Sequence, residues 1–134
     1  MALMSNSRFV ALISAVVALA LTATLSAHHS FPAYYFEDQL IEVEGPITSV
    51  EFKAPHVWVH VTARDTSGQE RTYSAEWSNP TRLERDGITK DTLKAADIVQ
   101  VWGAPSRNAS DNKMHLKRIH RASDGWEWGM NRRR

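Results

Sequence analysis

Hydrophobic and polar residues alternate most regularly along residues 54–63, which read A-P-H-V-W-V-H-V-T-A. Because successive side chains of a β-strand point to opposite faces, this alternation predicts a strand with one apolar and one more polar face. The first face carries Val57, Val59 and Val61, and the second carries His56, Trp58, His60 and Thr62. We expect the valines to lie in a hydrophobic core, so the second face requires another explanation.

A second alternating stretch covers residues 40–52, and its hydrophobic positions change phase part-way along. The first phase contains Ile41, Val43 and Ile47, and the second contains Val50 and Phe52. A glycine inside a strand often marks a bulge or a sharp bend, and a bulge shifts the alternation by one residue. The pattern therefore predicts one strongly bent strand, or two strands joined at a corner, with the irregularity at Gly45 and Pro46.

Three later stretches also alternate as strands do, and a short helix is predicted between the first two of them. The strand-like stretches are residues 70–77, 97–103 and 113–121. Asn79 followed by Pro80 is typical of a helix N-terminus, and Gly87 is typical of the position just after a helix. These signals predict about two helical turns over residues 81–86.

The order of these elements predicts a mainly β protein. Five strands, with a short helix between the third and the fourth, match a small closed barrel of the oligonucleotide/oligosaccharide-binding (OB) kind over residues 40–121. A bent first strand can pair with two neighbours, and closure removes the free sheet edges that favour aggregation. An open antiparallel sheet with a helix on one face is the alternative.

Residues 1–27 have the pattern of a secretory signal peptide. Arg8 is followed by an apolar run at residues 9–21 and then by small residues up to Ala27. This run is short for a bilayer-spanning helix, so an uncleaved membrane anchor is the alternative rather than the leading interpretation. We expect a periplasmic or secreted protein that has no stable membrane insertion after signal cleavage.

The two segments that flank the predicted barrel have weaker patterns. Residues 28–39 contain four aromatic residues and a proline without a clear period, which predicts an extended N-terminal arm laid over the barrel. Residues 122–134 end in three arginines and are predicted to form a flexible C-terminal tail. The sequence leaves open whether Trp126 and Trp128 in this tail pack against the barrel.

Charge and cysteine content narrow the range of functions. Removal of residues 1–27 takes away one of the 16 basic residues, Arg8, and none of the 15 acidic ones. The mature chain therefore has no excess of positive charge, and we expect no nucleic-acid partner. The chain has no cysteine, which excludes disulfides and thiolate metal sites.

Metal binding is expected at the mature N-terminus, if anywhere. A free amino group close to His28 and His29 offers amine, imidazole and backbone nitrogen donors, which suit Cu(II). His56 and His60 are poorer candidates as a pair, because four strand residues separate their Cα atoms by roughly 13 Å. A solvated N-terminal tail without a metal is the alternative.

No catalytic motif is present, and we expect a protein that is not an enzyme. The chain lacks H-E-x-x-H, G-x-S-x-G and glycine-rich phosphate-loop patterns. The leading expectation is a non-catalytic module that binds an envelope ligand or a protein partner through the strand face formed by His56, Trp58 and His60. A periplasmic copper-binding protein that uses His28 and His29 is the alternative.

Several stretches also carry a resemblance to a known family. These are A-H-H-S-F at residues 27–31, G-P-I-T-S-V-E-F-K-A-P-H-V-W-V-H-V at residues 45–61, and the segment from E-W-S-N-P to V-W-G-A-P at residues 76–105. They resemble the small exported bacterial proteins known as domain of unknown function 6152. The resemblance implies export and a common fold, and it implies no particular activity.

Overall fold

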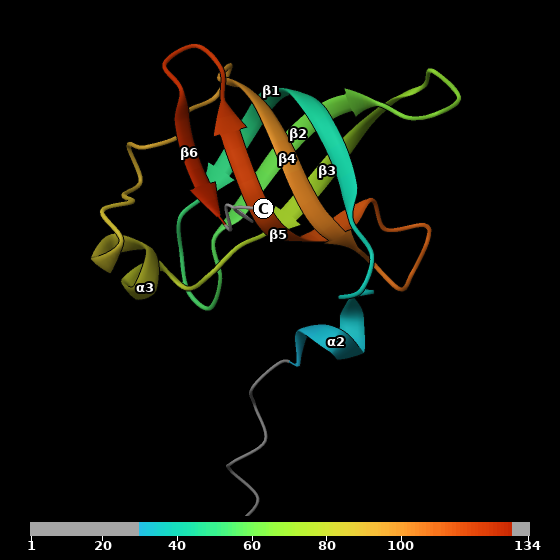
Figure 1. Cartoon of the computed structure of the whole chain (residues 1–134), viewed down its shortest axis with the longest axis horizontal. Helices are drawn as coiled ribbons and strands as arrows, with labels where there is room; N and C mark the ends of the chain where they lie inside the picture. The colour runs from blue at the N-terminus through green and yellow to red at the C-terminus, as the bar shows by residue number, and fades with distance from the viewer. Residues whose placement is uncertain (1–29, 130–134) are drawn as a thin grey trace, which may run out of the picture. The chain divides into compact units, whose positions relative to one another are not determined.

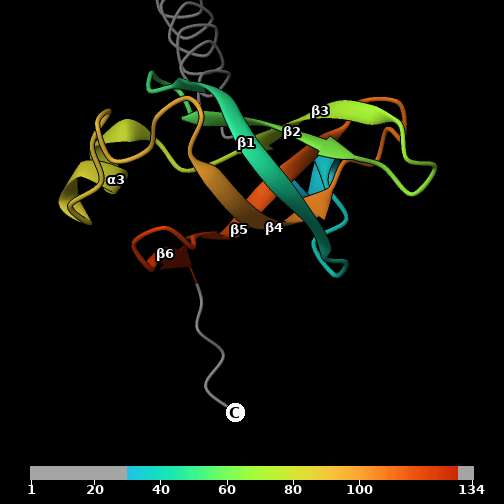
Figure 2. The ribbon, with the colours of Figure 1, turned by 90° about the horizontal axis from the view of Figure 1, so that it is seen from above.

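A computed structural model describes residues 30–129, and six of the eight secondary-structure elements there are strands of one curved sheet (Figure 1). The strands are β1 (Ile41–Glu51), β2 (Trp58–Arg64), β3 (Glu70–Glu76), β4 (Ile98–Pro105), β5 (Lys113–Arg121) and β6 (Trp126–Gly129). The helices are α2 (Phe31–Tyr34) and α3 (Pro80–Arg85). In both views, α2 and α3 lie at different ends of the sheet (Figures 1 and 2).

Five strands close into a barrel, which confirms the predicted fold class. The strand order is β3-β2-β1-β4-β5-β6, and an additional parallel pairing joins β3 to β5. The first half of β1 pairs with β4 and the second half with β2, as expected for a bent first strand. The sixth strand, β6, adds to β5 outside this closed set.

The bend in β1 has a different cause from the one predicted. The register shift lies between Ile47 and Ser49, so the bulge is not at Gly45 and Pro46. Gly45 is needed instead because β2 crosses close to it: a Cβ atom there would lie 1.9 Å from the backbone oxygen of Thr62. Sequence alone marks the glycine but does not distinguish a bulge from a close backbone approach.

The core forms where the inward positions of the strands meet. Val57, Val59 and Val61 are at most 1% exposed, which confirms that they face the interior. They pack in one cluster with Trp77 and with Leu83 of α3. The helix is held as predicted, because Asn79 Oδ1 accepts a hydrogen bond of 2.9 Å from the backbone N–H of Arg82, and Gly87 follows with a positive φ.

The flexible-tail prediction was wrong for the part of the C-terminal segment that the structure describes. Residues 126–129 form β6, which pairs with β5 from Arg118 to Arg121. Trp126 and Trp128 are two residues apart in β6 and therefore point to the same face. Both pack against the core, and this apolar contact holds the strand in place. Residues 130–134 lie outside the described region.

Residues 30–39 of the predicted N-terminal arm contact the barrel, and they are not extended throughout. Phe31–Tyr34 form the single helical turn of α2, closed by a 2.8 Å hydrogen bond from the Tyr35 N–H to the Phe31 carbonyl oxygen. A backbone bridge between Tyr35 and Ser106 then joins the arm to the chain just after β4. The predicted signal peptide, residues 1–27, falls outside the described part of the chain. Over residues 30–129, none of the helices has the length and apolar character needed to cross a membrane.

Candidate functional site

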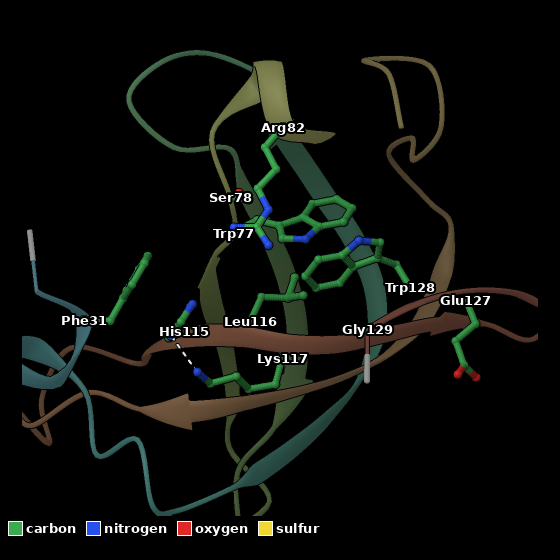
Figure 3. Close-up of a pocket in the computed structure, with 10 residues that line it drawn as sticks. All are labelled: Phe31, Trp77, Ser78, Arg82, His115, Leu116, Lys117, Glu127, Trp128 and Gly129. Atoms are coloured by element: carbon green, nitrogen blue, oxygen red, sulfur yellow. Dashed lines mark hydrogen bonds between the residues drawn. The ribbon is translucent and has the colours of Figure 1, made fainter. Parts of the chain in front are cut away.

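A concave surface of the described residues lies where two strands share one edge of β5. β3 pairs with β5 at Lys113–His115, and β6 pairs with it at Arg118–Arg121. Leu116 and Lys117 lie between the two pairings, and a groove of about 650 Å³ opens beside them. We call it the β5 groove; its lining comprises Phe31, Trp77, Ser78, Arg82, His115, Leu116, Lys117, Glu127, Trp128 and Gly129 (Figure 3).

Two tryptophans form the apolar wall of the β5 groove. Trp77 is 1% exposed and Trp128 is half-buried, and their rings meet edge to face with centroids 5.0 Å apart. Figure 3 shows the two indoles side by side at the centre of the groove. The Nε1–H of Trp77 is buried and has no hydrogen-bond partner within residues 30–129. Buried N–H groups in proteins usually have a hydrogen-bond partner, so the unpaired Trp77 N–H is an unusual feature of this wall.

Charged side chains line the rest of the groove, and within residues 30–129 only one of them lacks an ion-pair partner. Glu127 accepts a hydrogen bond of 2.7 Å from Arg118, and Lys117 donates to Glu37. Arg82 is exposed and reaches from α3 alongside Trp77 (Figure 3). Its guanidinium group makes no ion pair with the described residues, so the groove carries one uncompensated positive charge.

One end of the groove adjoins a hydrogen-bonded cluster under the N-terminal arm. Glu76, at the end of β3, accepts a hydrogen bond from the Tyr35 hydroxyl through Oε2. Its other carboxylate oxygen, Oε1, lies 2.6 Å from His56 Nδ1. Phe31 of the arm packs onto the barrel, with its ring stacked on that of His115 at a centroid distance of 3.7 Å. The same Phe31 ring lies 5.3 Å from the His56 ring. The arm thus connects His56, before β2, with His115 of β5.

A second carboxylate, that of Glu37 in the arm, lies on the other side of this cluster. Its Oε1 lies 2.8 Å from His115 Nδ1, and its Oε2 accepts a hydrogen bond from Lys117. Lys117 Nζ is also 2.9 Å from the same Nδ1 atom, as Figure 3 marks. Nδ1 donates to Glu37 only when it carries a proton, and it accepts from Lys117 only when it does not. The tautomer of His115 therefore selects between these two contacts.

Burial and these contacts change three pKa values. Burial alone would raise the pKa of the Glu37 carboxyl group, but hydrogen bonds from Lys117 and His115 outweigh it and keep this pKa below its ordinary value. Burial lowers the pKa of His115, despite the hydrogen bond with Glu37, and the charge of Lys117 lowers it further. Burial raises the pKa of the Tyr35 hydroxyl, and the hydrogen bond to Glu76 raises it further.

Acid is expected to destabilise the protein through this cluster. The unfolded chain binds protons more readily than the folded chain at His115 and at Glu37, so stability falls as pH drops below about 6.5 and falls further below about 4.5. The Glu37 part of this loss is expected as pH falls from about 4.5 through the lower pKa of the folded carboxyl group. Thermal melts across this range measure the loss as a decrease in Tm.

Glu37→Gln should reduce the part of this decrease that occurs below about pH 5. Glu84→Gln is the matched control, because Glu84 is an exposed carboxylate on α3, and it should retain the wild-type pH profile. An unchanged pH profile in Glu37→Gln would contradict the assignment to this carboxylate.

The predicted ligand-binding residues are divided between two environments. His56 belongs to the cluster under the arm, as described above. Trp58 and His60 lie in β2, where Trp58 is half-buried and both ring nitrogens of His60 are occupied, by Ser74 at 2.9 Å and by Glu51 at 3.2 Å. The ligand role of the three residues stays a prediction.

Metal binding also stays a prediction. His28 and His29, the expected Cu(II) ligands, lie outside the described residues. Within residues 30–129, no three histidine, aspartate or glutamate side chains are arranged to hold one metal ion.

The sequence analysis did not single out Arg82, His115 or Glu37 as site residues. Arg82 and His115 sit in patterns that specify only a helix and a strand, and their proximity depends on the closure of the barrel. For Trp128, the sequence does contain an indication of a strand. W-E-W-G alternates as a strand does, directly after the turn-forming pair Asp124 and Gly125.

The fold and the groove define a small closed β-barrel with one added strand and a lateral cleft. A family model described as a family of unknown function (DUF6152) matches residues 15–115. This is most of the chain, so the chain belongs to that family, as the resemblance predicted. No curated protein matches the sequence. The matched range ends at His115, so Trp128 and the rest of β6 lie beyond it.

Proposed function

We propose that this protein is an exported, non-catalytic binding module whose ligand occupies the β5 groove. The observation that carries the proposal is the groove itself, in which two tryptophans and an uncompensated arginine surround about 650 Å³. A concave site of 300–1,000 Å³ that combines apolar walls with a few polar groups is typical of ligand-binding pockets. The signal-peptide pattern of residues 1–27 supports export.

A binding role accounts for the chemistry beside the groove better than catalysis does. A general base must be able to reach a proton on the substrate. Here Glu37 is held by Lys117 and lies against His115, while Glu76 is held by Tyr35 and lies against His56. These contacts favour a structural role for the carboxylates, which fix the arm and place Phe31 at the groove.

The β5 groove is also a better candidate than the predicted face around Trp58. His60 has no free ring nitrogen for a ligand, because Ser74 and Glu51 occupy both. Trp58 lies on a strand within a continuous sheet, between Glu51 of β1 and Glu76 of β3. A ligand in the β5 groove would instead meet side chains from the arm, the segment just after β3, α3, β5 and β6.

A fragment screen followed by NMR tests this proposal on ¹⁵N-labelled exported protein. The probe is a library of small soluble molecules, and the readout is the shift of the tryptophan indole N–H signals. We expect hits to shift the signals of Trp128 and Trp77 and to leave that of Trp58 unchanged. Trp58 serves as the internal control, because it is half-buried like Trp128 but lies outside the groove.

Two outcomes of the screen would refute the groove as the binding site. Hits that shift only Trp58 would return the site to the β2 face. A screen without any hit that shifts Trp128 would remove the evidence for a ligand in the groove.

A further inference from the structure

We propose that the ligand of the β5 groove is an acidic saccharide, with a carboxylate bound by Arg82 and a sugar ring packed on Trp128. This inference rests on the proposed function, because it names the chemical class of ligand for the same groove. It is carried by two observations that meet there: the Arg82 cation, which has no ion pair among the described residues, and the partly exposed indole of Trp128.

Arg82 is positioned to bind an anion. Its backbone N–H is held by Asn79 Oδ1 at 2.9 Å, which anchors the residue at the start of α3. Its side chain extends into the groove alongside Trp77 (Figure 3). A guanidinium group binds a carboxylate through two parallel hydrogen bonds, so a single arginine can both attract and orient this group.

The other charges near the groove neither compete with this anion nor replace Arg82. Lys117 is paired with Glu37, and Glu127 is paired with Arg118 at 2.7 Å. Figure 3 shows Glu127 pointing away from the two indoles. One ligand carboxylate would therefore meet one free cation without facing an unpaired carboxylate of the protein.

Trp128 supplies a surface for a ring. Its indole is half-buried, and Trp77 supports it edge to face at a centroid distance of 5.0 Å. Aromatic side chains that have an apolar face and polar neighbours are suited to ligands with the same two properties, and sugar rings have apolar C–H faces and polar hydroxyl edges. Ser78 and His115 also line the groove, and neither the Ser78 hydroxyl nor the Nε2 atom of His115 has a hydrogen-bond partner among the described residues.

A single-stranded nucleic acid would need a different surface. It carries one phosphate per nucleotide, and its binding sites combine stacking aromatics with a positively charged track. The groove has one uncompensated cation, which matches one carboxylate better than a run of phosphates. The volume of about 650 Å³ is large enough for a ligand of drug-like size, such as a short oligosaccharide.

Isothermal titration calorimetry on the full exported chain tests the inference with trigalacturonate as the probe. The matched ligand is its trimethyl ester, which keeps the rings and masks the carboxylates. The matched variants are Arg82→Gln and Arg85→Gln, because both arginines are exposed on α3 and only Arg82 lines the groove.

Trigalacturonate is expected to bind wild-type protein and Arg85→Gln equally. Its affinity should fall by about 10- to 100-fold in Arg82→Gln, the range for loss of a charge-assisted hydrogen-bonded pair. The trimethyl ester should bind wild-type protein about 10- to 100-fold more weakly than the acid. Binding of the acid should shift the Trp128 indole N–H signal.

The inference is overturned if trigalacturonate does not bind at about 10 mM, a concentration well above the dissociation constants of specific sites. It is also overturned if the acid and its ester bind equally, or if Arg82→Gln and Arg85→Gln have equal affinities. Fragment hits that still shift Trp128 in these cases would leave the proposed function intact. An absence of such hits would refute both proposals.

Discussion

Replacement of Trp77 by alanine is expected to lower the free energy of unfolding by about 3–5 kcal/mol. Trp77 is 1% exposed and lies directly after β3, where it packs in the core cluster and supports Trp128. Removal of its indole leaves a large cavity that the closed barrel cannot fill, because the strands on both sides are fixed by pairing. Urea unfolding monitored by far-ultraviolet circular dichroism measures the loss.

Two variants test whether this loss comes from core packing. Trp77→Phe should recover part of the stability, because phenylalanine refills part of the cavity and has no N–H to leave unpaired. Trp58→Ala should cost less than Trp77→Ala, because Trp58 is only half-buried. Equal losses at the two tryptophans would contradict the assignment of Trp77 to the core.

Gly45→Ala is expected to destabilise the protein by about 3 kcal/mol. The added Cβ atom would lie 1.9 Å from the backbone oxygen of Thr62, and this backbone cannot move without separating β1 from β2. We expect the pairing of β1 with β2 to weaken near this position, so amide hydrogen exchange should increase in both strands. Chemical denaturation gives the change in stability.

Ser49→Ala is the matched control for Gly45→Ala. Ser49 is exposed, lies in the same strand and pairs with β2, so its replacement by alanine should change stability by less than about 0.5 kcal/mol. A wild-type stability for Gly45→Ala would show that β1 and β2 tolerate a wider separation at this point than the structure has.

Local patterns were sufficient to predict most of the barrel. The alternation around Val57, Val59 and Val61 identified a strand and its buried face, because the two-residue period of a strand is visible in adjacent residues. The helix beginning at Pro80 was also predictable, because Asn79 acts on the N–H group of a residue three positions away. A phase change in residues 40–52 indicated the bend of β1 but placed its bulge too early.

Predictions failed where a residue's role depends on distant chain segments. Gly45 is required by the passage of Thr62, a contact that no neighbour in sequence reveals. The segment containing Trp126 and Trp128 was predicted to be a flexible tail because it is short and ends in arginines. Its residues 126–129 instead form a strand, since the edge of β5 beyond the β3 pairing is free to accept it.

The sequence by itself determined the five strands of the closed barrel, the short helix, the buried face of β2 and the family, but not β6. It did so because secondary structure and core faces follow from periodicities of a few residues. Only the tertiary structure decided the β5 groove, in which Arg82 of α3, Trp128 of β6 and Phe31 of the arm line a single cleft. Their proximity arises because β3 and β6 pair with different parts of one edge of β5, and strand pairing between distant segments is set by closure of the whole barrel.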